Sequence, residues 1–237
     1  MHDGRTALDA FYASPRGAAA ARLIRTALRR LWPSVSGLSL LGLGCTEPYL
    51  RPFLSEAARI AAVSLPEQGA RAWPPGRASL AALAEDTALP FADRSFDRVL
   101  MVHALEASEH SRRTMREVWR VMQDGGRLIV VVPNRRGMWA HLEATPFGHG
   151  RPYSAGQLRR LCQAQMFTPL RQEELLFVPP FPWRPLLRGA RAWDAAGRAL
   201  CPGLAGLVVL EAEKTVLAPL TLEEAAPVRR TVMVETA

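Results

Sequence analysis

Lysine is almost absent from this chain: Lys214 is the only one among 237 residues. The net charge of +8 therefore comes almost entirely from arginines, which are scattered along the sequence and do not form basic runs. Nucleic-acid binding needs basic residues gathered on one face, with aromatic or groove-entering elements among them. The scattered charge therefore argues against nucleic acid as a partner.

Cysteine is also scarce. Cys45, Cys162 and Cys201 are odd in number, widely spaced and in no CxxC arrangement. Such a set supports neither a disulfide framework nor a metal site. We expect reduced thiols, most of them buried, and no bound metal.

Long apolar runs are missing as well. No stretch reaches the roughly 18 uninterrupted apolar residues that a membrane span requires, and segment 1–17 lacks the pattern of a secretory signal. Segment 16–32 predicts an amphipathic helix with arginines on one face. Such a helix can lie on an anionic membrane, but a solvated outer face on a packed helix is far commoner. We therefore expect a cytoplasmic protein without membrane contact.

The residues that are present predict one packed α/β domain. Hydrophobic residues make up 49% of the chain and charged residues 22%, which suits a globular protein rather than a disordered one. The continuous apolar runs SFDRVLMVHAL and RLIVVVP are typical of strands buried on both faces of a parallel sheet. Their alternation with helical segments predicts a doubly wound architecture.

The expected elements follow from these patterns. Gly125 and Gly126 suit the left-handed C-terminal cap of a helix, and Ser154 suits a helix N-cap. Helices are expected at 16–32, 111–126, 154–167 and 190–200, and strands at 37–43, 59–65, 79–84, 96–103, 127–132, 174–178 and 206–211.

Residues 84–134 carry the most specific pattern. The acidic pair Glu85 and Asp86 is followed by LPF, then by SFD with an apolar strand, and then by a helical segment that ends in GG before the next strand. In this order the chain resembles class I S-adenosylmethionine-dependent methyltransferases of the type 11-like branch, over about residues 38–167. Segment 206–216 looks like the last strand of that fold.

This resemblance implies a Rossmann-like fold. Its sheet would have seven strands, mostly parallel with an antiparallel last strand, in a single domain. We expect this methyltransferase-like domain at 34–217, a helical segment at 1–33 packed on it, and a flexible tail at 218–237.

The resemblance also implies S-adenosylmethionine as cofactor. An acceptor suits the exocyclic amine of adenine, and a strand end rich in carbonyls suits a sulfonium cation. The implied cofactor-binding residues are Gly42, Leu43, Gly44 and Cys45 at the methionine part, Glu85 and Asp86 at the adenine, and His103 and Ala104 near the sulfonium.

Several residues depart from the family pattern. Glu47 stands where a close-approach glycine is expected, and Ser64 replaces the carboxylate that grips the ribose, so that Glu67 is the nearest acid. Ala107 replaces a common histidine. Losing one charged hydrogen bond to ribose costs about 1.5 to 3 kcal/mol, or roughly ten- to a hundredfold in affinity. We therefore hypothesise that S-adenosylmethionine binds weakly or not at all.

Catalytic candidates are fewer, since methyl transfer needs mainly alignment, with an optional base. His103, His149 and Tyr153 are weak candidates, and Arg151 could hold an acidic substrate. Each has an equally good structural interpretation, in packing or in bonding its own loop. The aromatic residues could form a substrate lid or a patch buried by a partner protein: Trp139, Phe147, Phe181, Trp183 and Trp193.

Two functions from different classes remain. One is an S-adenosylmethionine-dependent methyltransferase that acts on a small-molecule acceptor. The other is a catalytically inactive methyltransferase-like subunit that binds or regulates a protein partner, or forms a homodimer. The altered glycine loop and the missing ribose acid favour the second; the complete order of elements favours the first.

Overall fold

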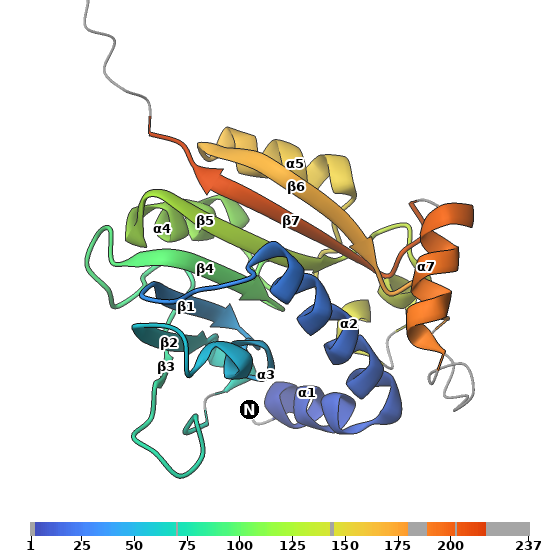
Figure 1. Ribbon diagram of the computed structural model, residues 1–237, viewed down its shortest axis with the longest axis horizontal. Helices are drawn as coiled ribbons and strands as arrows, with labels where there is room; N and C mark the ends of the chain where they lie inside the picture. Colours follow the sequence, from blue (N-terminus) through green and yellow to red (C-terminus); the bar gives the residue numbers. More distant parts are fainter. Residues whose placement is uncertain (1–2, 70, 143–144, 180–188, 202, 217–237) are drawn as a thin grey trace, which may run out of the picture.

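The computed structural model describes residues 3–69, 71–142, 145–179, 189–201 and 203–216 (Figure 1). Within them, seven strands form one sheet in the order β3-β2-β1-β4-β5-β7-β6. The strands are β1 (Ser39–Gly44), β2 (Arg59–Ser64), β3 (Ala81–Leu83), β4 (Phe96–Val102), β5 (Met122–Pro133), β6 (Phe167–Leu175) and β7 (Leu207–Lys214). The tail expected at 218–237, with Phe181 and Trp183, lies outside the described residues.

Strand direction confirms the predicted fold class. Strands β1 to β5 pair in parallel, whereas β7 is antiparallel to both β5 and β6. The sheet is therefore mostly parallel and doubly wound, and β7, the last strand in the chain, is antiparallel to its neighbours.

Helices cover both faces of the sheet. The longer ones are α1 (Asp3–Ala13), α2 (Pro15–Leu31), α4 (Ser111–Val121), α5 (Ala155–Ala164) and α7 (Ala190–Leu200); the short ones are α3 (Glu47–Leu50), η1 (Arg51–Phe53), η2 (Pro66–Gln68), η3 (Met138–His141) and η4 (Pro146–Gly148). Helix α2 crosses one face, and α4 and α5 lie on the other (Figure 1). Among the described helices, none combines the length and the apolar character needed to cross a membrane.

Two apolar clusters separate these layers. Successive side chains of a strand point to opposite faces, so Leu100 of β4 packs with α2 in the first cluster, whereas Val99 and Met101 pack with α4 in the second. Both faces of β4 are buried. This explains the continuous apolar run that predicted the strand.

Helix α2 begins where the sequence favours it. Ser14 is its N-cap and accepts a hydrogen bond from the Gly17 amide at 3.1 Å, and Pro15 occupies the first turn. Leu23, Ile24 and the other apolar residues of one face are buried, while arginines of the opposite face are exposed. The predicted helix is confirmed.

Two expected elements differ from the structure. A strand was expected at 174–178, but β6 spans Phe167–Leu175. Positions 171–174 are polar because β6 is an edge strand, and these polar residues give no apolar strand pattern in the sequence. Helix α4 ends at Val121, since Met122 already pairs with Phe96 of β4. Gly125, with φ +70°, therefore lies in an irregular start of β5 and is not a helix cap.

The capping box of α5 gives a stability prediction. Ser154 accepts from the Gln157 amide at 3.3 Å, and the Gln157 side chain accepts from the Ser154 amide at 3.0 Å. We expect Ser154→Ala to lower the free energy of unfolding by about 1 kcal/mol, because it leaves a helix amide without its acceptor. Urea unfolding measures this. Ser55→Ala, at an exposed turn, is the control and should change nothing; equal losses in both variants would contradict the assignment.

Candidate functional site

The carboxyl ends of β1 to β4 meet at one edge of the sheet, where ligands bind in open α/β folds. Two cavities lie at this edge. The first, here called the acidic cavity, has a volume of about 250 Å³, and the second, called the α1 cavity, about 720 Å³. Glu67 and Ala107 line both, so the cavities are neighbours.

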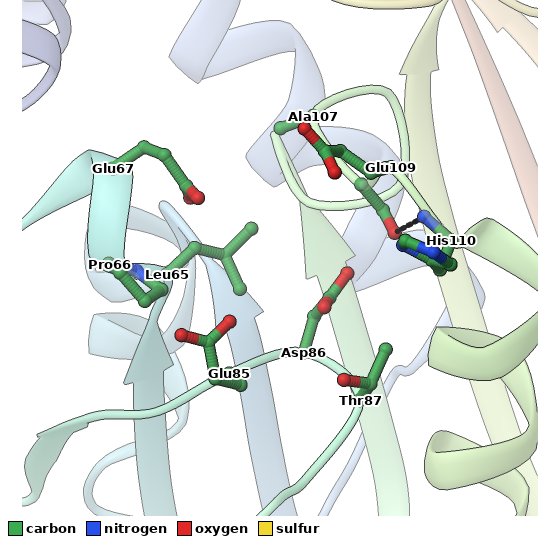
Figure 2. A pocket seen from close by; sticks show the side chains of 10 residues that line it. Leu65, Pro66, Glu67, Glu85, Asp86, Thr87, Ala107, Glu109 and His110 are labelled. Carbon is green, nitrogen blue, oxygen red and sulfur yellow. Dashed lines mark hydrogen bonds between the residues drawn. The ribbon is translucent and has the colours of Figure 1, made fainter.

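The acidic cavity lies between the segments that follow β2, β3 and β4 (Figure 2). Its walls are Leu65, Pro66, Glu67, Glu85, Asp86, Thr87, Ala107, Ser108, Glu109 and His110. Four of these side chains are carboxylates, and among the described residues neither lysine nor arginine lines the cavity. Carboxylates accept hydrogen bonds and attract cations. The cavity therefore suits a ligand rich in hydroxyl and amino groups and repels phosphates.

Asp86 is held in a fixed position in this cavity. Its Oδ2 accepts a hydrogen bond from the Thr114 hydroxyl of α4 at 2.7 Å, and that hydroxyl also lies 2.7 Å from Ser108 Oγ. Glu85, in contrast, is exposed and projects beside it (Figure 2). The structure thus brings Glu67, Glu85 and Asp86, all expected at the cofactor, to one cavity.

The loop after β1 is placed differently from the expectation. Thr46 is 0% exposed, and Cys45 and Glu47 are buried with it. A Cβ at Gly42 would lie 2.1 Å from Thr46 Oγ1, because the loop folds back directly over β1. Gly42, Leu43, Gly44 and Cys45 line neither cavity. The protein's own packing therefore accounts for glycine at position 42.

Two hydrogen bonds link the end of β4 to the segments that follow β1 and β2. The Cys45 amide donates to the Val102 carbonyl at 2.8 Å. The side-chain amide of Gln68, from η2, donates to the His103 carbonyl. Since β1 lies between β2 and β4 in the sheet, the Gln68 side chain spans the end of β1. The strand-end carbonyl expected to face the sulfonium is thus already engaged.

His103 belongs to a chain of three side chains, in which His103 and Glu106 are buried and Tyr12 is partly buried. The Tyr12 hydroxyl of α1 lies 2.6 Å from Nε2 of His103, and Oε1 of Glu106 lies 3.2 Å from its Nδ1. Burial raises the pKa of the Tyr12 phenol well above its usual range, so this hydroxyl stays protonated. When Tyr12 donates to Nε2, the ring hydrogen sits on Nδ1, toward Glu106.

The α1 cavity lies beside this chain. An apolar wall from α1 faces polar residues that follow β2 and β4, and the full lining is Ala7, Leu8, Ala10, Phe11, Ser14, Arg16, Glu67, Gln68, His103, Glu106, Ala107, Thr145, Pro146, His149 and Gly150. His103 and His149, expected as candidate catalytic residues, both line it. Helix α1 falls within the helical segment expected at 1–33, but no site residue was expected in it, so its part in this site was missed.

The remaining expected residues lie elsewhere. Tyr153 packs partly buried against the second apolar cluster and lines neither cavity. The Arg151 backbone donates to the Glu106 carbonyl at 2.8 Å, while its side chain is exposed. Trp139 and Phe147 are buried in the first cluster and form no exposed patch, whereas Trp193 is exposed on α7.

Among the site residues missed from the sequence are Tyr12, Gln68 and Glu106. Gln68 stands next to Glu67, and Glu106 lies in the LEA that was compared with the family's pattern, so both had a local signal. Tyr12 had none, because its role depends on where α1 folds back along the sheet edge.

The sheet order, with β7 antiparallel between β5 and β6, defines the fold of class I methyltransferases. Residues 41–130 match the family described as methyltransferase domain. The resemblance inferred from the sequence is thus confirmed. A comparison with curated proteins finds no significant match.

Solved structures share this fold at low identity. The complex between the Haloferax volcanii Trm112 methyltransferase activator and a methyltransferase matches with a TM-score of 0.61 and 18% identity, over 91% of this chain and 99% of that chain. An S-adenosylmethionine-dependent methyltransferase from Archaeoglobus fulgidus gives 0.60 and 17%, over 82% and 94%. The cyclase SpnF gives 0.56 and 21%, over 84% and 82%. At such identities the matches establish the fold.

The residues present fit only part of S-adenosylmethionine. The acidic cavity offers acceptors for an adenosine group. The methionine group has no matching space at the loop after β1, because Thr46 packs over Gly42 and the Gln68 side chain donates a hydrogen bond to the His103 carbonyl. In this conformation the site therefore does not fit the whole cofactor.

The substitution Gly44→Ala tests how closely β1 packs against β4 at their carboxyl ends. It adopts φ +90°, and a Cβ would lie 2.2 Å from the Val102 carbonyl oxygen. We expect Gly44→Ala to cost about 2 to 5 kcal/mol, from left-handed strain and the backbone clash together. Gly76→Ala is the matched control, since Gly76 has φ +75° and nothing within 4 Å of its Cβ position. It should lose about 1 to 2 kcal/mol in urea unfolding. Equal losses would contradict the predicted clash.

Cys45 reports whether the loop after β1 stays closed. In native protein we expect iodoacetamide to modify Cys201, which is exposed, and to spare Cys45 and Cys162, which are buried. Burial also raises the pKa of the Cys162 thiol to about 12, so little thiolate forms there. Peptide mass mapping identifies the modified residues. Labelling of Cys45 as fast as Cys201 would show instead that the loop opens in solution.

Proposed function

We propose that this protein is a methyltransferase-fold binding protein that takes an adenosine-type ligand in the acidic cavity and does not bind S-adenosylmethionine in the manner of the family. The observation that carries this proposal is the hydrogen bond from the Gln68 side chain to the His103 carbonyl, across the end of β1. It occupies an acceptor that the resemblance assigns to the sulfonium end of the cofactor.

Energetics support the proposal. Displacing Gln68 breaks a hydrogen bond between buried groups, which costs about 1 to 3 kcal/mol when no partner replaces it. Ser64, at the end of β2, offers the ribose no carboxylate, and this makes the binding free energy less favourable by about a further 1.5 to 3 kcal/mol. The sum corresponds to an affinity that is lower by roughly a hundredfold or more. An adenosine group alone avoids the first cost, because it does not need the end of β1.

An active methyltransferase on a small molecule is the second candidate. It is favoured by Glu67 and Ala107, which line both cavities. A methyl donor bound in one cavity and a methyl acceptor bound in the other would therefore lie side by side. This function requires Gln68 and the loop after β1 to move when the cofactor binds.

Isothermal calorimetry with adenosine and S-adenosylmethionine distinguishes the two candidates. We expect the native protein to bind S-adenosylmethionine no more tightly than adenosine. Gln68→Ala removes the side chain that spans β1, so it should tighten S-adenosylmethionine relative to adenosine by roughly five- to a hundredfold.

Gln163→Ala, on the exposed side of α5, is the control and should leave both affinities unchanged. If native protein binds S-adenosylmethionine at least tenfold more tightly than adenosine, the binding-protein proposal fails and the methyltransferase candidate gains. A protein that binds neither ligand also contradicts the proposal.

A further inference from the structure

The α1 cavity contains a buried carboxylate whose role the adenosine site does not explain. Glu106 is 4% exposed and lines this cavity. Among the described residues, neither of its carboxylate oxygens has a hydrogen-bond partner of good geometry, although Oε1 lies 3.2 Å from His103 Nδ1. Burying a charge is costly unless it is paired. The ion-pair contact that the described part of the chain gives Glu106 is to a histidine, which is not a permanent cation.

We propose that the α1 cavity binds a small organic molecule that carries a protonated amine, and that Glu106 is the counter-charge for this amine. The proposal concerns a different cavity from the adenosine site and does not depend on what binds there. It rests on the position and burial of one carboxylate, and on its Oε2, which accepts no hydrogen bond among the described residues.

Neighbouring charges favour an amine over an acid. His103 Nδ1 lies 3.2 Å from Glu106 Oε1, while Nε2 of the same ring contacts the Tyr12 hydroxyl, so the imidazole is shared between two neighbours. Glu67 adds a second carboxylate to the wall. Arg16 also lines the cavity but has an interaction partner of its own. A ligand ammonium would therefore complete the charge balance beside Glu106.

The rest of the cavity suits an apolar ligand body. Ala7, Leu8, Ala10 and Phe11 of α1 line the same cavity as Glu106. A volume of about 720 Å³ lies within the range of small-molecule sites, which combine apolar walls with a few polar groups. An amine with an aromatic or aliphatic body satisfies both parts of the cavity.

The backbone holds Glu106 in place before any ligand arrives. Its carbonyl accepts from the Arg151 amide at 2.8 Å. Gly150, with φ +79°, packs so closely that a Cβ there would lie 2.4 Å from that carbonyl oxygen. A carboxylate fixed in this way loses little conformational entropy on binding, which increases affinity.

Three probes of similar shape test the charge preference on the full chain. We expect ligand-observed NMR titration to show that 2-phenylethylamine binds at least tenfold more tightly than propylbenzene, which is neutral, and than 3-phenylpropionate, which is an anion. Glu106→Gln keeps the side-chain volume and removes the charge, so it should weaken the amine by tenfold or more. Glu213→Gln, at a partly exposed glutamate on β7 that lines neither cavity, is the matched control and should change nothing.

A second variant covers the case that Glu106→Gln does not fold. Ala7 is exposed on α1 and lines the cavity, so Ala7→Trp should fill it and abolish amine binding without disturbing the core. Adenosine binding, measured in parallel, should stay unchanged in both variants. Equal binding of the three probes, an unaffected amine affinity in Glu106→Gln, or no amine binding to the native protein would each overturn the proposal.

Discussion

Two hydrogen bonds to the end of β4 determine the shape of the whole site. The amide of Cys45 donates to the carbonyl of Val102 and continues the β1–β4 ladder, and the side chain of Gln68 donates to the carbonyl of His103, at the edge where ligands bind in this architecture. Protein groups therefore already bond the backbone at this strand end. The space that remains between the described residues is divided into two cavities, on either side of Glu67 and Ala107, and neither extends along the loop after β1.

Helix α1 also contacts the segments at this end of the sheet. Tyr12 reaches the imidazole of His103, and its ring also lies edge to face against Tyr49 beyond β1. Phe11 packs against Phe147 at 5.5 Å between ring centroids. Because these contacts join α1 to the segments that follow β1, β4 and β5, the cavity and the order at the end of β4 depend on the N-terminal helix remaining docked.

The parts that the sequence predicted are those governed by local pattern. The run through Val99 and Met101 specifies a strand buried on both faces, and the order of such strands specifies the sheet. Strand β6 was misplaced because an edge strand carries polar residues on its open side. At Gly42, the sequence shows that a side chain is excluded but not which atom excludes it, and in the structure that atom is the oxygen of Thr46. The partner of Gln68 is 35 residues away in the chain, so no local pattern indicates it.

The distribution of charge adds a separate constraint. The chain carries a net charge of +8, yet among the described lining residues of the two cavities the acidic and basic side chains, histidines apart, are all carboxylates except Arg16. Low-dielectric walls strengthen the field of such carboxylates inside a cavity. This field favours any cation, including a sulfonium as well as an ammonium. Charge alone therefore does not choose between these ligands. In the proposed function, the closed end of β1 makes this choice, because in this conformation it leaves no space for the methionine limb, whereas the α1 cavity beside Glu106 stays open.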